Sequence, residues 1–167
     1  MNNGKHHGCC EHSHGCSGGG CCKSKSDGIT IDKYELAVLK ELLEYNYLPI
    51  SRFIMCSSHT DEARFTALAP VYIDDKADSM EMVKSFARRL DIMAEKKLIS
   101  LDYGSALQGY DYEQHKNSDL FHYFESTVKE GAEKPGHLCD TAEIECGSVS
   151  MTPFGLTAAQ RYFEFEE

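Results

Sequence analysis

The sequence predicts an α+β fold that is mainly α with a small β-hairpin, preceded by a tail rich in cysteine and histidine. Helical spacing of apolar residues after capping residues indicates the helices. Two short segments, 98–103 and 148–151, alternate apolar and polar residues and indicate the hairpin. The first 28 residues lack valine, leucine and isoleucine, so they cannot form a core. We therefore divide the chain into a tail, 1–28, and a folded domain, 29–167.

Length and composition indicate one soluble domain. The chain has 167 residues, of which 41% are hydrophobic and 26% charged, with a formal net charge of −10. It lacks the run of about 18 apolar residues that a membrane-spanning helix needs and the apolar run of a secretory signal, so we expect a cytoplasmic protein. Lysine and arginine concentrate in 29–104, whereas 105–147 is acidic. A nucleic-acid binder would therefore need a local basic face.

Helices are expected in five places. Capping boxes at Asp32–Glu35 and Asp78–Glu81 precede apolar stripes and predict helices at 33–45 and 79–97. Ser51 can cap a short apolar helix, in which Cys56 is a core residue. The three further helices are expected at 52–56, at 119–130 before Gly131, and from Thr152-Pro153 to about Phe163.

The predicted strands are few and short. Residues 65–73 favour a strand, but Pro70 limits them to a sheet edge or an extended loop. The alternating segments 98–103 and 148–151 can pair as a hairpin. Between them lies an acidic insertion, 105–147, which carries the predicted helix at 119–130.

The tail has the donor atoms of a soft-metal site. Thiolates and imidazoles at this density suit zinc, copper(I) or nickel, and ligation can supply the ordering energy that packing lacks. The spacing does not match regular zinc-finger patterns, so a disordered reactive tail or a metal-storage arm remains the alternative. The candidate ligands are Cys9, Cys10, His12, His14, Cys16, Cys21 and Cys22.

The insertion offers a possible second metal site. His137, Cys139 and Cys146 could supply three zinc ligands, completed by another histidine or by the tail. The alternative, favoured by the irregular spacing, is two ordinary thiols in a mobile loop near Pro135-Gly136.

The order helix, short helix, long helix, strand, strand, helix resembles the winged helix-turn-helix of bacterial transcription regulators. The resemblance is carried by Glu35–Leu43, Leu48–Ser51, Phe86–Leu90, Glu95–Ile99 and Met151–Gly155. In that family the third helix enters the major groove and the wing contacts the DNA backbone. The resemblance therefore implies that 79–97 is a recognition helix.

The resemblance also implies specific DNA contacts and a homodimer. The implied contacts to phosphates or bases are Lys84, Arg88 and Arg89, with Lys96 and Lys97 at the base of the wing. Paired half-sites need two recognition helices, so we expect a dimer. The expected dimer surfaces are the first and last helices, the last of which carries Tyr162, Phe163 and, near the terminus, Phe165. Alternatively, the basic residues form a solvated face and the aromatic residues pack against the first helix.

These observations favour a winged-helix DNA-binding transcriptional regulator with a metal- or thiol-responsive tail. The alternative is a metal-binding or metal-delivery protein whose winged helix docks a protein partner. We do not expect an enzyme, because the sequence lacks a nucleophile elbow, a zincin pair and a dinucleotide-binding pattern. A thiol redox or sulfur-carrier activity at Cys21-Cys22 would have only Lys23 as an activating partner.

Overall fold

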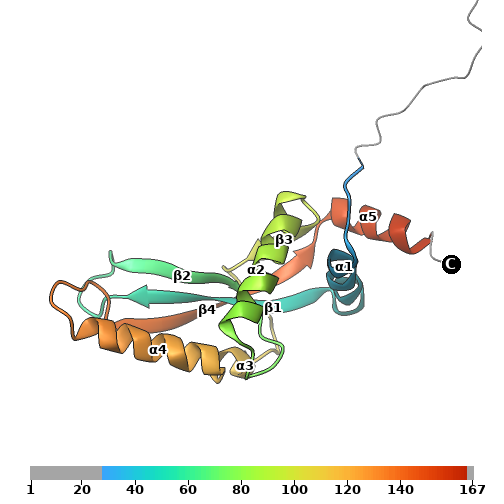
Figure 1. The fold of residues 1–167 in the computed structure, drawn as a ribbon. Coiled ribbons are helices and arrows are strands. Elements are labelled where there is room, and N and C mark those ends of the chain that lie inside the picture. Colours follow the sequence, from blue (N-terminus) through green and yellow to red (C-terminus); the bar gives the residue numbers. More distant parts are fainter. Residues whose placement is uncertain (1–27, 165–167) are drawn as a thin grey trace, which may run out of the picture.

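The computed structural model describes residues 28–164, which form a four-stranded antiparallel sheet with helices packed around it (Figure 1). None of the helices in this part of the chain combines the length and apolarity needed to span a bilayer. The elements in order are α1 (Lys33–Tyr45), β1 (Tyr47–Cys56), β2 (Arg64–Val71), α2 (Met80–Glu95), β3 (Ile99–Asp102), α3 (Glu113–Lys116), α4 (Asp119–Ala132), β4 (Thr141–Met151) and α5 (Pro153–Glu164).

The sheet has the strand order β2-β1-β4-β3 and is organised by the pairing of β1 with β4. That pairing runs without interruption from Tyr47 opposite Ser150 to Cys56 opposite Thr141. β3 covers only the last part of β4, and β2 covers the other end of β1. As expected for a strand that contains Pro70, β2 lies at a sheet edge.

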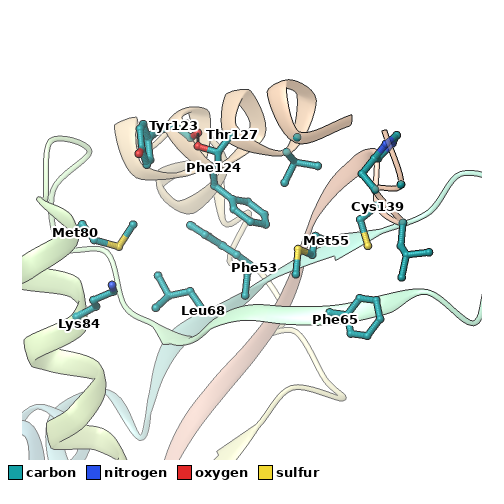
Figure 2. Close-up of a pocket in the computed structure, with 16 residues that line it drawn as sticks. Phe53, Met55, Phe65, Leu68, Met80, Lys84, Tyr123, Phe124, Thr127 and Cys139 are labelled. Carbon is teal, nitrogen blue, oxygen red and sulfur yellow. Dashed lines mark hydrogen bonds between the residues drawn. The ribbon is translucent and has the colours of Figure 1, made fainter. Parts of the chain in front are cut away.

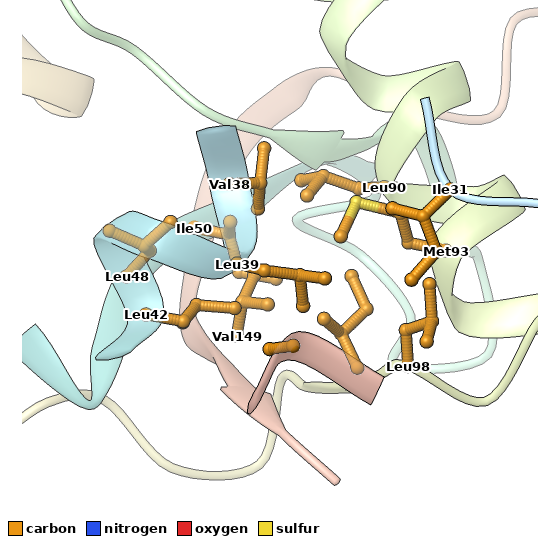
Figure 3. Packing of buried hydrophobic residues seen from close by; sticks show 12 residues of the cluster. Ile31, Val38, Leu39, Leu42, Leu48, Ile50, Leu90, Met93, Leu98 and Val149 are labelled. Atoms are coloured by element: carbon orange, nitrogen blue, oxygen red, sulfur yellow. The ribbon is translucent and has the colours of Figure 1, made fainter. Parts of the chain in front are cut away.

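A first hydrophobic cluster, the proximal core, lies where β1 begins (Figure 3). α1 contributes Leu39 and Leu42, and α2 contributes Leu90 and Met93, at the helical spacing that the sequence showed. Ile50 and Val149 come from the two central strands. Phe163 of α5 packs against this cluster, and the backbone N–H of Ile31 donates to the Tyr162 hydroxyl over 3.4 Å. Both aromatic residues therefore contact their own chain.

A second cluster, the distal core, lies further along β1. It joins Phe53 to Val71 of β2, Ile73 just after that strand, Val83 of α2, and Leu120 and Phe121 of α4. Figure 1 shows α4 running beside this half of the sheet, while α1 and α5 gather at the other end. The fold thus has two cores that share the same central strands.

The predicted helix starts are largely confirmed. Asp32 and Glu35 form the expected capping box of α1. Thr152 Oγ1 accepts from the N–H of Gly155 at the start of α5, where a Cβ on Gly155 would collide with the carbonyl oxygen of Leu98. At α2 the capping residue is Ser79, one residue later than expected, and its side chain accepts from the N–H of Met82.

The short helix predicted at 52–56 is wrong, because these residues belong to β1. Phe53 and Ile54 are both buried, although neighbouring residues of a strand point to opposite faces of the sheet. A short apolar run without alternation fits a buried strand as well as a buried helix. The sequence pattern is therefore compatible with both structures, and the prediction selected the helix where the chain forms a strand.

The predicted two-stranded hairpin is only part of the four-stranded sheet. β3 and β4 do pair, as expected, and Ile99 lies opposite Met151. However, β4 begins at Thr141 rather than Ser148, so residues 141–147 of the predicted insertion form more than half of a central strand. The excursion between β3 and β4 is therefore limited to residues 103–140 and contains α3 and α4.

A buried ion pair ties the start of the domain to the end of α2. Glu35 is only 1% exposed, and the ammonium of Lys96 lies 2.6 and 2.8 Å from its two carboxylate oxygens. The same ammonium donates to the Thr30 carbonyl over 2.9 Å. Lys96, an expected DNA contact, thus has a structural role as the partner of a buried carboxylate.

We expect Lys96→Met to lower the free energy of unfolding by about 2 kcal/mol, because the Glu35 carboxylate would stay buried without its cation. Lys97→Met is the matched control, since Lys97 is exposed and should change stability by less than about 0.5 kcal/mol. Urea unfolding of the three proteins measures the difference. An equal loss in both variants would show that the ion pair contributes nothing specific.

Candidate functional site

The most prominent site in the described residues is an apolar groove of ≈ 710 Å³, here called the α4 groove. It opens between α4 and the loop after it, the second half of β1, the first half of β2, and the start of α2 (Figure 2). Its lining residues are Phe53, Met55, Phe65, Ala67, Leu68, Met80, Lys84, Tyr123, Phe124, Thr127, Val128, Gly131, Gly136, His137, Leu138 and Cys139.

The groove results from the side-chain spacing of a strand and of a helix, β1 and α4. Phe53 and Met55 are two residues apart on β1 and therefore point to the same face of the sheet, toward α4. On α4, Phe124 and Val128 are four residues apart and face back toward the strand. Gly131 continues this row without a side chain, and the space that a Cβ would enter there is open. The groove therefore stays unfilled toward the end of α4.

Aromatic rings form the floor. The Phe53 ring stacks on Phe124 with centroids 5.5 Å apart and meets Phe121 edge-on at 5.1 Å. Such pairs contribute about 0.5–1.5 kcal/mol beyond their buried area. The floor is thus an apolar surface built from aromatic rings in contact with one another.

The groove has apolar rims and distinct ends. Phe65, Tyr123 and Leu138 are 44%, 65% and 69% exposed, so large apolar side chains face solvent around the opening. Figure 2 shows Lys84 and Met80 on the α2 side, with the Lys84 amine directed toward the groove, and Cys139 on the opposite side. A ligand lying in the groove would therefore meet a cation at one end and a thiol at the other.

Next to the groove, a buried polar pair joins α3 to β1. Ser51 and His115 are both completely buried, and a hydrogen bond of 2.8 Å joins Ser51 Oγ to His115 Nδ1. His115 Nε2 has no hydrogen-bond partner in the described part of the chain. The Tyr112 hydroxyl donates to the Gly147 carbonyl over 2.6 Å and closes the cluster.

This pair has a structural role. A serine beside a histidine can act as a nucleophile and its base, but both side chains here are sealed from substrate. Burial lowers the pKa of His115 to about 4, so the ring is neutral at pH 7. Burial likewise raises the pKa of the neighbouring Cys146 thiol. The pair anchors α3, and through it the start of α4.

The basic residues expected to contact DNA have different surroundings. Arg89 lies over the Tyr34 ring at 4.4 Å, and Lys96 pairs with Glu35. Lys84 lines the α4 groove. Arg88 and Lys97 are exposed. Lys84 and Arg88 are four residues apart on α2 and therefore lie on the same side of the helix, whereas Lys96 is held by Glu35. DNA contact stays a prediction.

The second metal site is not assembled as expected. Cys139 precedes β4, whereas Cys146 lies near the middle of β4, opposite Ser51 of β1. At about 3.3 Å per residue the two thiols lie on the order of 20 Å apart. Among residues 28–164, no three histidine, cysteine or acidic side chains come together as a metal site. The candidate ligands of the tail, Cys9 to Cys22, lie outside the described residues, so their metal binding stays a prediction.

Sequence reasoning missed the α4 groove because its walls come from five separate segments, which are 53–55, 65–68, 80–84, 123–131 and 136–139. The one available signal was the apolar face of α4, which carries Phe121, Phe124 and Val128 at helical spacing. Comparison of the chain with protein-family models, curated proteins and solved structures finds no match.

We expect the His115 environment to make stability depend on pH. The folded-state pKa of about 4 lies below the ordinary 6.5, so protonation favours the unfolded chain and stability falls as pH drops from 6.5 toward 4. Between pH 7.5 and 5 the loss should be about 2 kcal/mol. His115→Leu should flatten this slope, whereas His122→Gln, at an exposed position on α4, should keep it. Urea unfolding at both pH values tests this, and an unchanged slope in His115→Leu would contradict it.

Proposed function

We propose that the protein binds an apolar small molecule in the α4 groove. The observation that carries the proposal is the combination of a ≈ 710 Å³ volume with an almost entirely apolar lining. Ligand sites in proteins measure about 300–1,000 Å³ and pair apolar walls with a few polar groups. Thr127, Tyr123 and Lys84 are such groups here.

The exposed rim supports the same conclusion. Phe65, Tyr123 and Leu138 leave apolar surface in water around one opening, a feature typical of sites that are covered by a ligand or partner. The described ends of the domain offer no cover, because α1 and α5 lie at the other end of the sheet (Figure 1). A bound apolar ligand would bury both the floor and the rim.

We expect Ala67→Trp to block binding, because Ala67 lines the groove and an indole would occupy its volume. Thr66→Trp is the control, since Thr66 is exposed and is not part of the lining. Titration with the neutral dye Nile red should give one bound dye in the native protein and in Thr66→Trp. Affinity should fall roughly tenfold or more in Ala67→Trp, at least about 1.4 kcal/mol. Equal affinity in all three proteins would place the dye elsewhere.

A second candidate is the winged-helix DNA-binding regulator. Its support is the order of elements in the proximal half, where α1, α2, the paired strands β3 and β4, and α5 follow one another as in that fold. The short middle helix of the pattern is replaced here by β1 and β2. Arg88 on α2 is exposed and would be free to meet a phosphate.

On this second candidate, Arg88→Ala should weaken DNA binding and lower the slope of log affinity against log salt by about 0.9, the loss of one phosphate contact. Arg161→Ala, an exposed arginine on α5, should leave the slope unchanged. Binding to fragmented genomic DNA at several salt concentrations measures both. Equal slopes in the native protein and Arg88→Ala would remove α2 from the interface.

A further inference from the structure

The charge around the α4 groove differs from that of the whole chain. Aspartate and glutamate number 27 against 17 lysine and arginine, yet the groove lining contains no carboxylate. Lys84 is its one permanently charged side chain. A strongly acidic protein thus presents a groove whose only fixed charge is positive.

Lys84 is not engaged by the protein. Among residues 28–164, four basic side chains pair with glutamates, namely Arg52, Arg64, Lys96 and Lys116, whereas Lys84, like most of the other lysines and arginines, makes no ion pair. Glu81 lies three residues earlier on α2, within reach of an i,i+3 pair, but the structure has no such contact. Instead the Lys84 side chain borders the groove, with its amine directed toward it (Figure 2).

We propose that the α4 groove selects an apolar carboxylate, with the carboxylate at Lys84 and the hydrocarbon chain over the aromatic floor toward Cys139. This inference rests on the proposed function and specifies its ligand class. One ammonium balances one negative charge, whereas phosphate groups usually recruit arginine forks or several donors. The lining stretch of α4, Tyr123 to Gly131, is about 12 Å long and matches an extended medium-length alkyl chain.

The chain's own tail does not suit this groove. Residues 2–27 contain no alanine, valine, leucine, isoleucine, methionine, phenylalanine or tyrosine. Such a segment has no apolar surface with which to cover Phe53, Phe124 and Leu68. A small amphiphile supplies both the apolar chain and the counter-charge that Lys84 lacks.

The test compares three ligands with the same ten-carbon chain and different heads: decanoate, decanol and decyltrimethylammonium. Calorimetric titration uses the full-length reduced protein, with each ligand below its micelle concentration. Decanoate should bind about fivefold more tightly than decanol, and the cation most weakly. Lys84→Met, which keeps an unbranched side chain one atom shorter and removes the charge, should bring decanoate to the affinity of decanol. Lys84→Arg should retain the preference, and Lys97→Met should behave as the native protein.

The outcomes separate the two proposals. Equal binding of decanoate and decanol by the native protein, or an equal loss of both in Lys84→Met, would overturn the carboxylate assignment and leave an apolar site. Failure of all three ligands to bind would overturn the groove as a ligand site altogether. In that case, analytical ultracentrifugation of the native protein and of Tyr123→Glu would test whether a second copy of the chain covers the groove. A native dimer that dissociates in Tyr123→Glu would assign the groove to self-association.

Discussion

The register between β1 and β4 is the constraint on which the rest of the fold depends. Near its start, β1 turns Leu48 and Ile50 toward α1 and the proximal core. Near its end, the opposite face carries Phe53 and Met55 toward α4. Side chains alternate along a strand, so a slip of one residue against β4 would exchange both sets at once. Because the two cores lie on opposite faces of the sheet, both of them favour the observed register of β1 against β4. The α4 groove forms only in that register.

Sequence reasoning succeeded where a pattern was local and failed where it was shared between distant segments. α1, α4 and α5 carry caps and apolar stripes within their own residues and were predicted closely. β1 lacks alternation because both its faces are buried around Phe53 and Ile54, so it was taken for a helix. In β4, Ala142 and Ile144 alternate with Glu143 and Glu145. That strand signal was present, but it was hidden by the acidic character of the segment.

α2 contributes residues both to the α4 groove and to the expected DNA-binding surface. Its first turns supply Met80 and Lys84 to the groove and Val83 to the distal core. Its later turns supply Leu90 and Met93 to the proximal core, and the residue after it, Lys96, pairs with Glu35. Val83, Leu90 and Met93 are almost fully buried, so the helix is held at both ends. A ligand at its start and a macromolecule on its exposed face would contact one rigid element.

The long separation between β1 and β4 also sets the order in which this protein can acquire its structure. Residues 57–140 must be synthesised before the central partner of β1 begins to emerge. Until then only β2 is available, and β1 presents an open edge and uncovered apolar side chains. Pairing between segments so far apart in sequence is slow to form. The nascent chain therefore passes through a prolonged stage in which β1 is exposed to aggregation, and the sheet can be completed only when β4, from Thr141 to Met151, has left the ribosome.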